Sequence, residues 1–429
     1  MMGARIRNDG VPRRIRPPRG PERTTFFLLG PAFVAAIAYV DPGNVAANLT
    51  AGARYGYLLL WVLIIANLIA VLVQYQSAKL GLVTGRSLSE LLGSKLRTGP
   101  RRAYWVQAEL VAAATDVAEI IGGAIALHLL FGLPLLLGGV IIGFASLLLL
   151  QIQSQRSQRA FEGVIIVLLG VIVVGFVSGL FVSDLDPAEV FGGIVPRFAG
   201  IDSVLLATSM LGATVMPHVI YLHSALARDR HGVPGDGRSE NSAARIRTLL
   251  VATRWDVAAA LLVAGAVNIA MLLLAAASLY GVAGTDTIEG AHAAIVTALG
   301  PTIGVIFAVG LLASGLASTS VGTYAGSSIM DGLLKVRIPV MTRRVITIIP
   351  ALVILGVGFD PTRALVLSQV VLSFGIPFAL IPLVRLASSR AEMGEFANST
   401  WLRWVSWLAV VAIVSINLVL IVLVVATGL

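Results

Sequence analysis

The chain has 429 residues and a net charge of +9; 57% of its residues are hydrophobic and only 12% are Asp, Glu, Lys or Arg. Soluble domains carry about 25% charged residues, and a soluble fold could not bury this much apolar surface, as the mean hydropathy of +0.91 also indicates. The composition therefore indicates a polytopic membrane protein and excludes a disordered chain, a coiled coil or a repeat solenoid. Because the chain contains no cysteine, disulfides and thiolate metal sites are also excluded.

Apolar stretches long enough to cross a hydrocarbon layer of about 30 Å recur after a basic tail at residues 1–23. We interpret the first stretch as an uncleaved span, because no small-residue cleavage site follows it. The pattern predicts about eleven transmembrane helices, with ten or twelve as alternatives because the divisions within 104–152 and 281–302 are weak. The predicted spans are 25–47, 58–81, 104–130, 133–152, 162–183, 203–226, 253–281, 302–327, 342–359, 364–386 and 403–427.

The distribution of Lys and Arg predicts the orientation of the chain. Positive residues gather in the N-terminal tail and in the linkers after even-numbered spans, for example Arg86, Lys95, Arg228, Arg245, Lys335 and Arg337. The other linkers hold few cations and carry the acids Asp184, Asp186, Glu189, Asp286 and Glu289. By the positive-inside rule we expect a multi-pass protein of the cell membrane with a cytoplasmic N-terminus and an external C-terminus. The positive charge thus reports topology and does not indicate nucleic-acid binding.

The first span contains the sequence Asp41-Pro42-Gly43-Asn44 at mid-membrane. Pro42 lacks a backbone donor and Gly43 relaxes the backbone, so the pair predicts an interrupted helix. An interruption is tolerated in lipid only where the freed backbone lines a cavity. A carboxylate at this depth costs several kcal/mol unless it is paired or functional, so Asp41 is a candidate site residue.

The sixth span repeats this signature around Met216-Pro217, with Gly212 and Ala213 just before the proline. Five spans from the first and five from the sixth make two halves, and an odd repeat length inverts the second half relative to the first. Paired interruptions in corresponding spans are typical of a transporter site between inverted repeats. We therefore predict a first repeat at 24–200, a second repeat at 201–390 and an eleventh helix within 391–429.

The donor set at these two breaks indicates a cation. The Asp41 carboxylate, the Asn44 amide oxygen and the freed carbonyls of Ala38 and Ala213 are oxygen ligands that suit hard cations. Met216 adds a thioether, which favours manganese(II), iron(II) and later metals over magnesium and calcium. An ordinary core methionine is the alternative for Met216.

Further ionisable residues lie inside the predicted spans. Three acids of the third span, Glu109, Asp116 and Glu119, fall within roughly 80° of one helix face. Such acids either line a proton-conducting path or form a static ion-pair network. Two histidines of the sixth span, His218 and His223, are candidate proton carriers, or else satisfied core residues.

Arg343 and Arg344 open the ninth span. They are either anchors at the cytoplasmic surface or counter-charges to the acids of the third span. In the eighth span, small residues recur at every fourth position, which predicts a close-packing helix seam without a role in substrate binding. The seam consists of Gly310, Ser314, Ser318, Gly322 and Gly326.

At these motifs the chain resembles the natural-resistance-associated macrophage protein (Nramp) family, in particular its bacterial proton-coupled manganese transporters. The resemblance covers nearly everything after residue 24. It rests on the DPGN motif at 41–44 together with the segments QYQSAKLGLVTG (74–85), WVQAELVAAATDVAE (105–119), GATVMPHVIYLHSAL (212–226) and LSQVVLSFG (367–375).

The resemblance implies an all-α membrane fold, the leucine-transporter-like 5+5 inverted repeat with helices 1 and 6 broken at mid-membrane. It implies a metal site formed by Asp41, Asn44, Met216 and the Ala213 carbonyl, joined in some conformations by Gln369 and the Ala38 carbonyl. It also implies a proton route, to which we assign Asp41, His218, Glu109, Asp116, Glu119, Arg343 and Arg344, with His223 as a further candidate.

We therefore expect a proton-coupled importer of divalent transition metals, manganese(II) first, iron(II) second and cadmium(II) as a further candidate. Its partners are the metal ion, protons and the lipid bilayer. No nucleotide motif is present, and we expect no nucleic acid, no cofactor and no enzymatic activity; a membrane enzyme would need metal ligation of the HExxH type. A cation-coupled amino-acid symporter of the same fold is the alternative, although Asp41 would repel a substrate carboxylate.

Overall fold

The structure is a computed structural model that describes residues 30–155, 158–231, 242–285, 287–334 and 340–427. Within these ranges every regular element is a helix. The basic tail at 1–23 and the loop residues Lys335 and Arg337 lie outside the described residues. The main helices are α1 (Pro31–Ala38), α2 (Pro42–Tyr55), α3 (Leu60–Thr84), α5 (Thr98–Phe131), α6 (Leu135–Gln155), α7 (Gln158–Val177), α9 (Ile201–Thr214), α10 (Pro217–His231), α11 (Ser242–Ser278), α13 (Pro301–Leu334), α14 (Val340–Gly356), α15 (Pro361–Ala387) and α17 (Thr400–Thr427).

Both interruptions predicted from the sequence are present. The first span divides into α1 and α2, and the sixth divides into α9 and α10, in each case just before a proline. The weak division between the third and fourth spans is real, because Gly132 ends α5 in the left-handed conformation (φ 67°). The stretch between the seventh and eighth spans holds α12 (Ile288–Leu299), which is too short to cross a membrane.

Several helices differ in length from the predicted spans. Seven helical segments of the described residues are long and apolar enough to cross a membrane. α11 has 37 residues, or about 55 Å, and so extends well beyond the hydrocarbon layer. α2 continues to Tyr55 rather than ending near residue 47. Hydropathy marks only the apolar part of a helix, which explains why α11 begins before its predicted span and α2 continues beyond its own.

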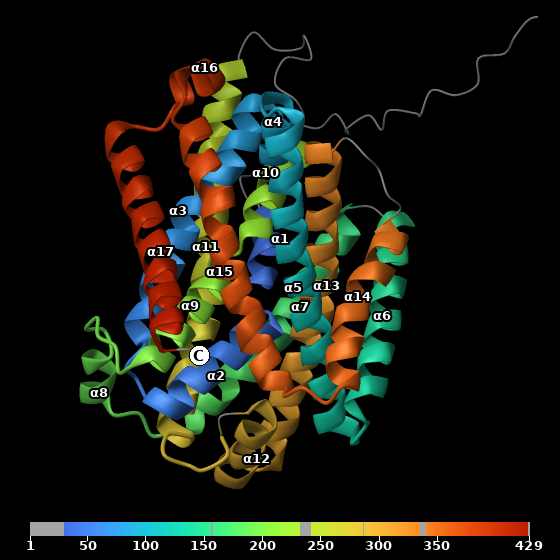
Figure 1. Cartoon of the computed structure of the whole chain (residues 1–429), viewed down its shortest axis with the longest axis vertical. Coiled ribbons are helices and arrows are strands. Elements are labelled where there is room, and N and C mark those ends of the chain that lie inside the picture. The colour runs from blue at the N-terminus through green and yellow to red at the C-terminus, as the bar shows by residue number, and fades with distance from the viewer. Residues whose placement is uncertain (1–29, 156–157, 232–241, 286, 335–339, 428–429) are drawn as a thin grey trace, which may run out of the picture.

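The short helices lie at the two ends of the bundle (Figure 1). α4 (Leu88–Lys95) and α16 (Arg390–Met393) lie at one end, whereas α8 (Pro187–Gly192) and α12 lie at the other. The remaining short elements are η2 (Ser178–Val182) and η3 (Gly394–Phe396). The linkers after the second and tenth spans, which hold α4 and α16, thus share one end, as an alternating topology requires.

The broken helices lie inside the bundle, because long helices surround them. α11 packs against α1 and α2, α13 packs along α5 and α7, and α15 packs along α9. The seam of α13 is as close-packed as predicted: a Cβ atom on Gly310 would lie 3.0 Å from the Cα atom of Gly175 in α7. This framework holds both helix breaks in the protein interior.

Candidate metal site and buried charge network

The break between α1 and α2 is built around Asp41, the N-cap of α2. Asp41 is extended (φ −76°, ψ 167°), and its Oδ1 atom accepts a hydrogen bond of 2.8 Å from the Asn44 backbone amide. Asn268 of α11 donates to the Tyr39 carbonyl at 2.8 Å, and Ser314 of α13 donates to the Val40 carbonyl at 2.5 Å. These bonds satisfy carbonyls that the break removes from the helical ladder, so the interruption is stable in a buried position.

Asn44 joins the first break to the second. Its Nδ2 atom donates to Asp41 Oδ1 at 2.9 Å and to the Ala213 carbonyl at 2.9 Å. Ala213 lies in the last turn of α9, three residues before Met216, which directly precedes α10. The structure thus brings together Asp41, Asn44 and Ala213, which were predicted as ligands from two segments far apart in the sequence.

Gln369 of α15 lies against both breaks. A Cβ atom on Gly43 would lie 1.8 Å from Gln369 Nε2, and one on Gly212 would lie 1.9 Å from the Gln369 carbonyl oxygen. Glycine at 212 is therefore required for the backbone of α15 to approach so closely, and glycine at 43 leaves room for the Gln369 side chain. The contact places the side-chain amide of Gln369 beside the start of α2, where the resemblance expects it.

Three buried oxygen atoms around this point have no hydrogen-bond partner: Asp41 Oδ2, Asn44 Oδ1 and Gln369 Oε1. Their side chains are fully buried, with 0% exposure. An unpaired buried polar atom costs about 1–3 kcal/mol, so unpaired acceptors on α2 with its N-cap and on α15 indicate a site that favours a cation. No group of three or more His, Cys, Asp or Glu side chains in the described ranges could hold a metal, which leaves this mixed oxygen set as the candidate.

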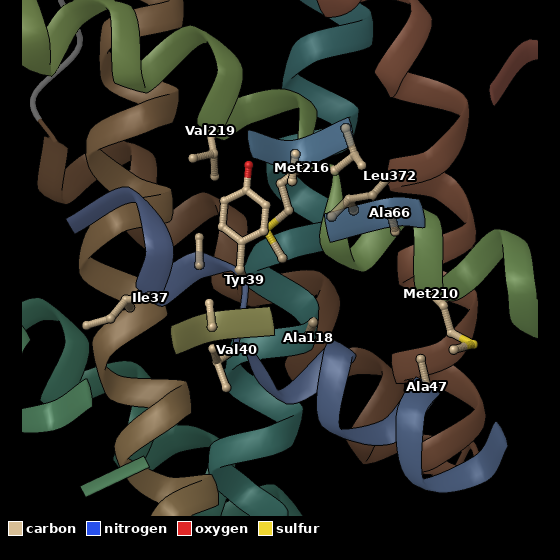
Figure 2. Close-up of a cluster of buried hydrophobic side chains, with 14 of the residues drawn as sticks. Ile37, Tyr39, Val40, Ala47, Ala66, Ala118, Met210, Met216, Val219 and Leu372 are labelled. Carbon is tan, nitrogen blue, oxygen red and sulfur yellow. The ribbon is translucent and has the colours of Figure 1, made fainter. Parts of the chain in front are cut away.

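The remaining two predicted ligands also lie at the breaks. Ala38 is the last residue of α1, and Met216 directly precedes α10. Figure 2 shows the Met216 thioether beside the ring of Tyr39, within a cluster that also contains Val219 and Leu372. Met216 is fully buried and therefore lies at the second break in contact with the apolar core.

The charges of α5 and α14 form a charge network of two ion-pair clusters beside the candidate site, one around Arg344 and one between Arg343 and the half-buried Glu109. Arg344 is fully buried; it pairs with Asp116 and lies 3.4 Å from Glu119. Arg343 pairs with Glu109 at 3.0 Å. Of the two interpretations of the arginine pair, this geometry favours counter-charges over anchors at the membrane surface. Three acids face two arginines, so the network contains one more carboxyl group than guanidinium groups.

The two histidines occupy different surroundings. His218 Nδ1 lies 3.3 Å from the hydroxyl of Thr115, the neighbour of Asp116, and His218 Nε2 is buried without a partner. His218 thus lies between the break and the charge network. His223 Nδ1 instead lies 2.8 Å from Gln74 Oε1 on α3, and no contact between His223 and the acids of α5 is found among the described residues.

Sequence analysis missed several uncharged residues that support these charges. The Ser146 hydroxyl accepts from Arg344 Nε at 3.1 Å and the Thr319 hydroxyl accepts from Arg344 at 3.3 Å. Gln74 donates to the Tyr39 hydroxyl at 2.5 Å. Their only sequence signal is a polar residue inside an apolar span, which is too common to single out a site.

A pair of broken helices that share a buried cluster of oxygen acceptors defines a secondary transporter of the inverted-repeat class. The fold agrees with this class: the structure is similar to that of MhsT in complex with L-phenylalanine, with a TM-score of 0.61 at 12% identity, covering 90% of this chain and 98% of that one. At this identity the likeness concerns the fold alone.

The family model described as natural resistance-associated macrophage protein-like matches residues 32–423. A curated relative, the divalent metal cation transporter MntH of Mycobacterium tuberculosis (strain CDC 1551 / Oshkosh), is 61% identical over 383 residues, which are 89% of this chain and 88% of the relative. The manganese transporter of Eremococcus coleocola, in complex with an aromatic bis-isothiourea substituted compound, has a similar structure (TM-score 0.83, 30% identity, covering 94% of this chain and 88% of that one). The chain belongs to the Nramp family of membrane transporters.

Proposed function

We propose that the protein is a proton-coupled importer of divalent transition metal ions, with manganese(II) as the first substrate, iron(II) as the second and cadmium(II) as a further one. The observation that carries this proposal is the set of unpaired buried oxygens of Asp41, Asn44 and Gln369 at the junction of two broken helices. These atoms supply the carboxylate and amide ligands that divalent cations prefer. The names of the relatives, which are divalent metal and manganese transporters, support the same substrate class.

In this proposal the transported ion binds Asp41, Asn44, the Ala213 carbonyl and Met216. Gln369 and the Ala38 carbonyl join as the helices close. Asn44 contributes its oxygen after its amide group has rotated away from its contact with the Ala213 carbonyl. Met216 supplies the thioether that separates manganese(II) from calcium(II) and magnesium(II).

Protons follow a route beside the metal in this proposal. His218 lies between the break and α5, and Asp116, Glu119 and Arg344 continue the route toward Arg343 and Glu109. The excess of one carboxyl group over the guanidinium groups is what supports proton transfer here, because an ion-paired network with one extra acid can hold or release a proton. His223 contacts Gln74 instead, so we assign it no step.

Access alternates between the two sides of the cell membrane, with the linkers after even-numbered spans in the cytoplasm. The candidate ligands are fully buried, so an ion enters only when helices move. A cavity of about 360 Å³ lies at the end of the bundle that holds α12; its lining includes Thr50, Asp202, Thr287 and Thr362. Thr50 is nine residues beyond Asp41 on α2, about 13 Å along the helix, and in this proposal the cavity is the outer approach to the site.

Uptake of labelled manganese(II) into proteoliposomes tests the proposal. We expect saturable uptake that rises with external acidity, is inhibited by iron(II) and cadmium(II), and is unaffected by equal concentrations of magnesium(II) or calcium(II). Acidification of the lumen during metal entry would report proton movement. Uptake of amino acids without metal uptake would instead support the symporter alternative and contradict the proposal.

A further inference from the structure

The small-residue seam of α13 does more than pack against other helices. Gly322 and Gly326 lie one turn apart on this seam, and each faces a charged side chain of the buried network. We propose that these two glycines are positioning residues that seat Glu119 and Arg343, and that they thereby set the pH dependence of transport. The inference rests on the proposed proton coupling and adds two uncharged residues to it.

Gly322 provides the seat for the carboxyl group of Glu119. A Cβ atom at this position would lie 2.9 Å from Glu119 Oε1 and 3.6 Å from the Thr115 methyl group. Glu119 Oε1 is buried without a hydrogen-bond partner, so this oxygen is directed at the space that the missing side chain leaves open. The other oxygen, Oε2, lies 3.4 Å from Arg344. A methyl group here would therefore displace the carboxyl group within the network.

Gly326 provides the corresponding seat for Arg343. A Cβ atom on Gly326 would lie 2.1 Å from the central carbon of the Arg343 guanidinium group. The guanidinium group therefore rests directly on the backbone of α13, in the space that a side chain at 326 would fill. Arg343 also pairs with Glu109 at 3.0 Å. Since the helix cannot yield, an added methyl group has to move Arg343 relative to Glu109.

The charges around each seat are known from the structure. Glu119 lies 3.4 Å from Arg344 of α14, which also pairs with Asp116 of α5. Arg343 pairs with Glu109 of α5. In a medium of low dielectric constant such interactions change steeply with distance, so small displacements at either seat alter proton affinity in the network. The other close approach on the seam, between Gly310 and Gly175, involves only backbone and the ring of Phe176.

This difference along one helix provides a matched experiment. Gly322→Ala and Gly326→Ala are compared with the control Gly310→Ala, because each adds one methyl group to the same seam. Manganese(II) affinity at neutral pH and uptake between pH 5 and 8 are measured for each variant in proteoliposomes. We expect the midpoint of the pH profile to shift by about 0.5–1 pH unit in Gly322→Ala and Gly326→Ala. Gly310→Ala should retain the profile of the unmodified protein.

Shortening the displaced side chain tests the mechanism. Glu119→Asp removes one methylene group and keeps the charge, so the double variant Gly322→Ala/Glu119→Asp should recover thermal stability and pH profile relative to Gly322→Ala. If the double variant does not recover, or if Gly310→Ala shifts the pH profile equally, Gly322 does not position Glu119. If uptake by the unmodified protein does not depend on pH, proton coupling itself is wrong; the double-mutant cycle of thermal stability still decides whether Gly322 seats Glu119.

Discussion

The substitution Asp41→Asn tests the proposed metal site without disturbing the fold. Asparagine is as good an N-cap as aspartate, so the 2.8 Å bond from the Asn44 amide to the side chain at position 41 can persist. What the substitution removes is the negative charge beside the unpaired oxygens. Loss of one partner from a buried charged pair costs about 2–5 kcal/mol, which corresponds to about a 30-fold to several-thousandfold loss of affinity.

Isothermal titration with manganese(II) on the purified protein measures this loss, and thermal unfolding checks the fold. Asp186→Asn is the matched control. Asp186 also caps a helix in front of a proline and accepts from a backbone amide at 2.8 Å, but it lies in the exposed segment before α8. We expect the control to bind manganese(II) like the unmodified protein. If Asp41→Asn binds manganese(II) within about threefold of the unmodified protein, Asp41 is not the anionic ligand and the proposed site is wrong.

Three further substitutions test selectivity, coupling and stability. Met216→Ala leaves an all-oxygen site, so we expect it to retain some manganese(II) uptake, to lose more cadmium(II) uptake and to admit calcium(II) better. If the ratio of manganese(II) to calcium(II) uptake does not change, Met216 is a packing residue and not a ligand. Asp116→Asn should weaken the acceleration of uptake by external acid more than it weakens manganese(II) binding. Uptake measured at several pH values and calorimetric titration with manganese(II) report the two effects. Equal losses in both would contradict a role of Asp116 in the proton route. Arg344→Met leaves Asp116 and Glu119 without their buried counter-charge, and we expect a destabilisation of about 3–5 kcal/mol. Its thermal unfolding temperature should therefore lie below that of the control Arg403→Met, at the exposed start of α17. Equal unfolding temperatures would show that the network adds nothing to stability.

The sequence predicts the architecture well because its decisive signals are local. Pro42 and Pro217, each close to small residues, mark both breaks, whereas Pro350, Pro377 and Pro382 lie inside continuous helices. The same locality explains the errors at helix ends, because α11 continues through polar residues that hydropathy does not count as membrane. α4 begins with a capping box at Ser87 and Glu90, a local signal that we did not use.

The candidate site was predictable only in part, since its members are selected by different kinds of information. Asp41 and Asn44 follow from charge and amide chemistry at a break, whereas Gln369 follows from the family resemblance alone. Neither source indicates that Gly322 faces Glu119, because that contact depends on how α13 lies on α5. The same limit applies to His223, whose partner Gln74 belongs to a helix distant in the sequence.

The hydrogen bonds of the Asn44 amide group bear on the return step of the transport cycle, in which no ion is carried. A carrier that has delivered its ion must return empty, and two half-helices held together only by a cation would separate at that moment. In the structure the Asn44 amide group donates to Asp41 and to the Ala213 carbonyl, and so links the two breaks directly. A rotation of one side-chain torsion exchanges this donor for an acceptor. The same residue can therefore close the unloaded carrier for its return and open it to the next ion.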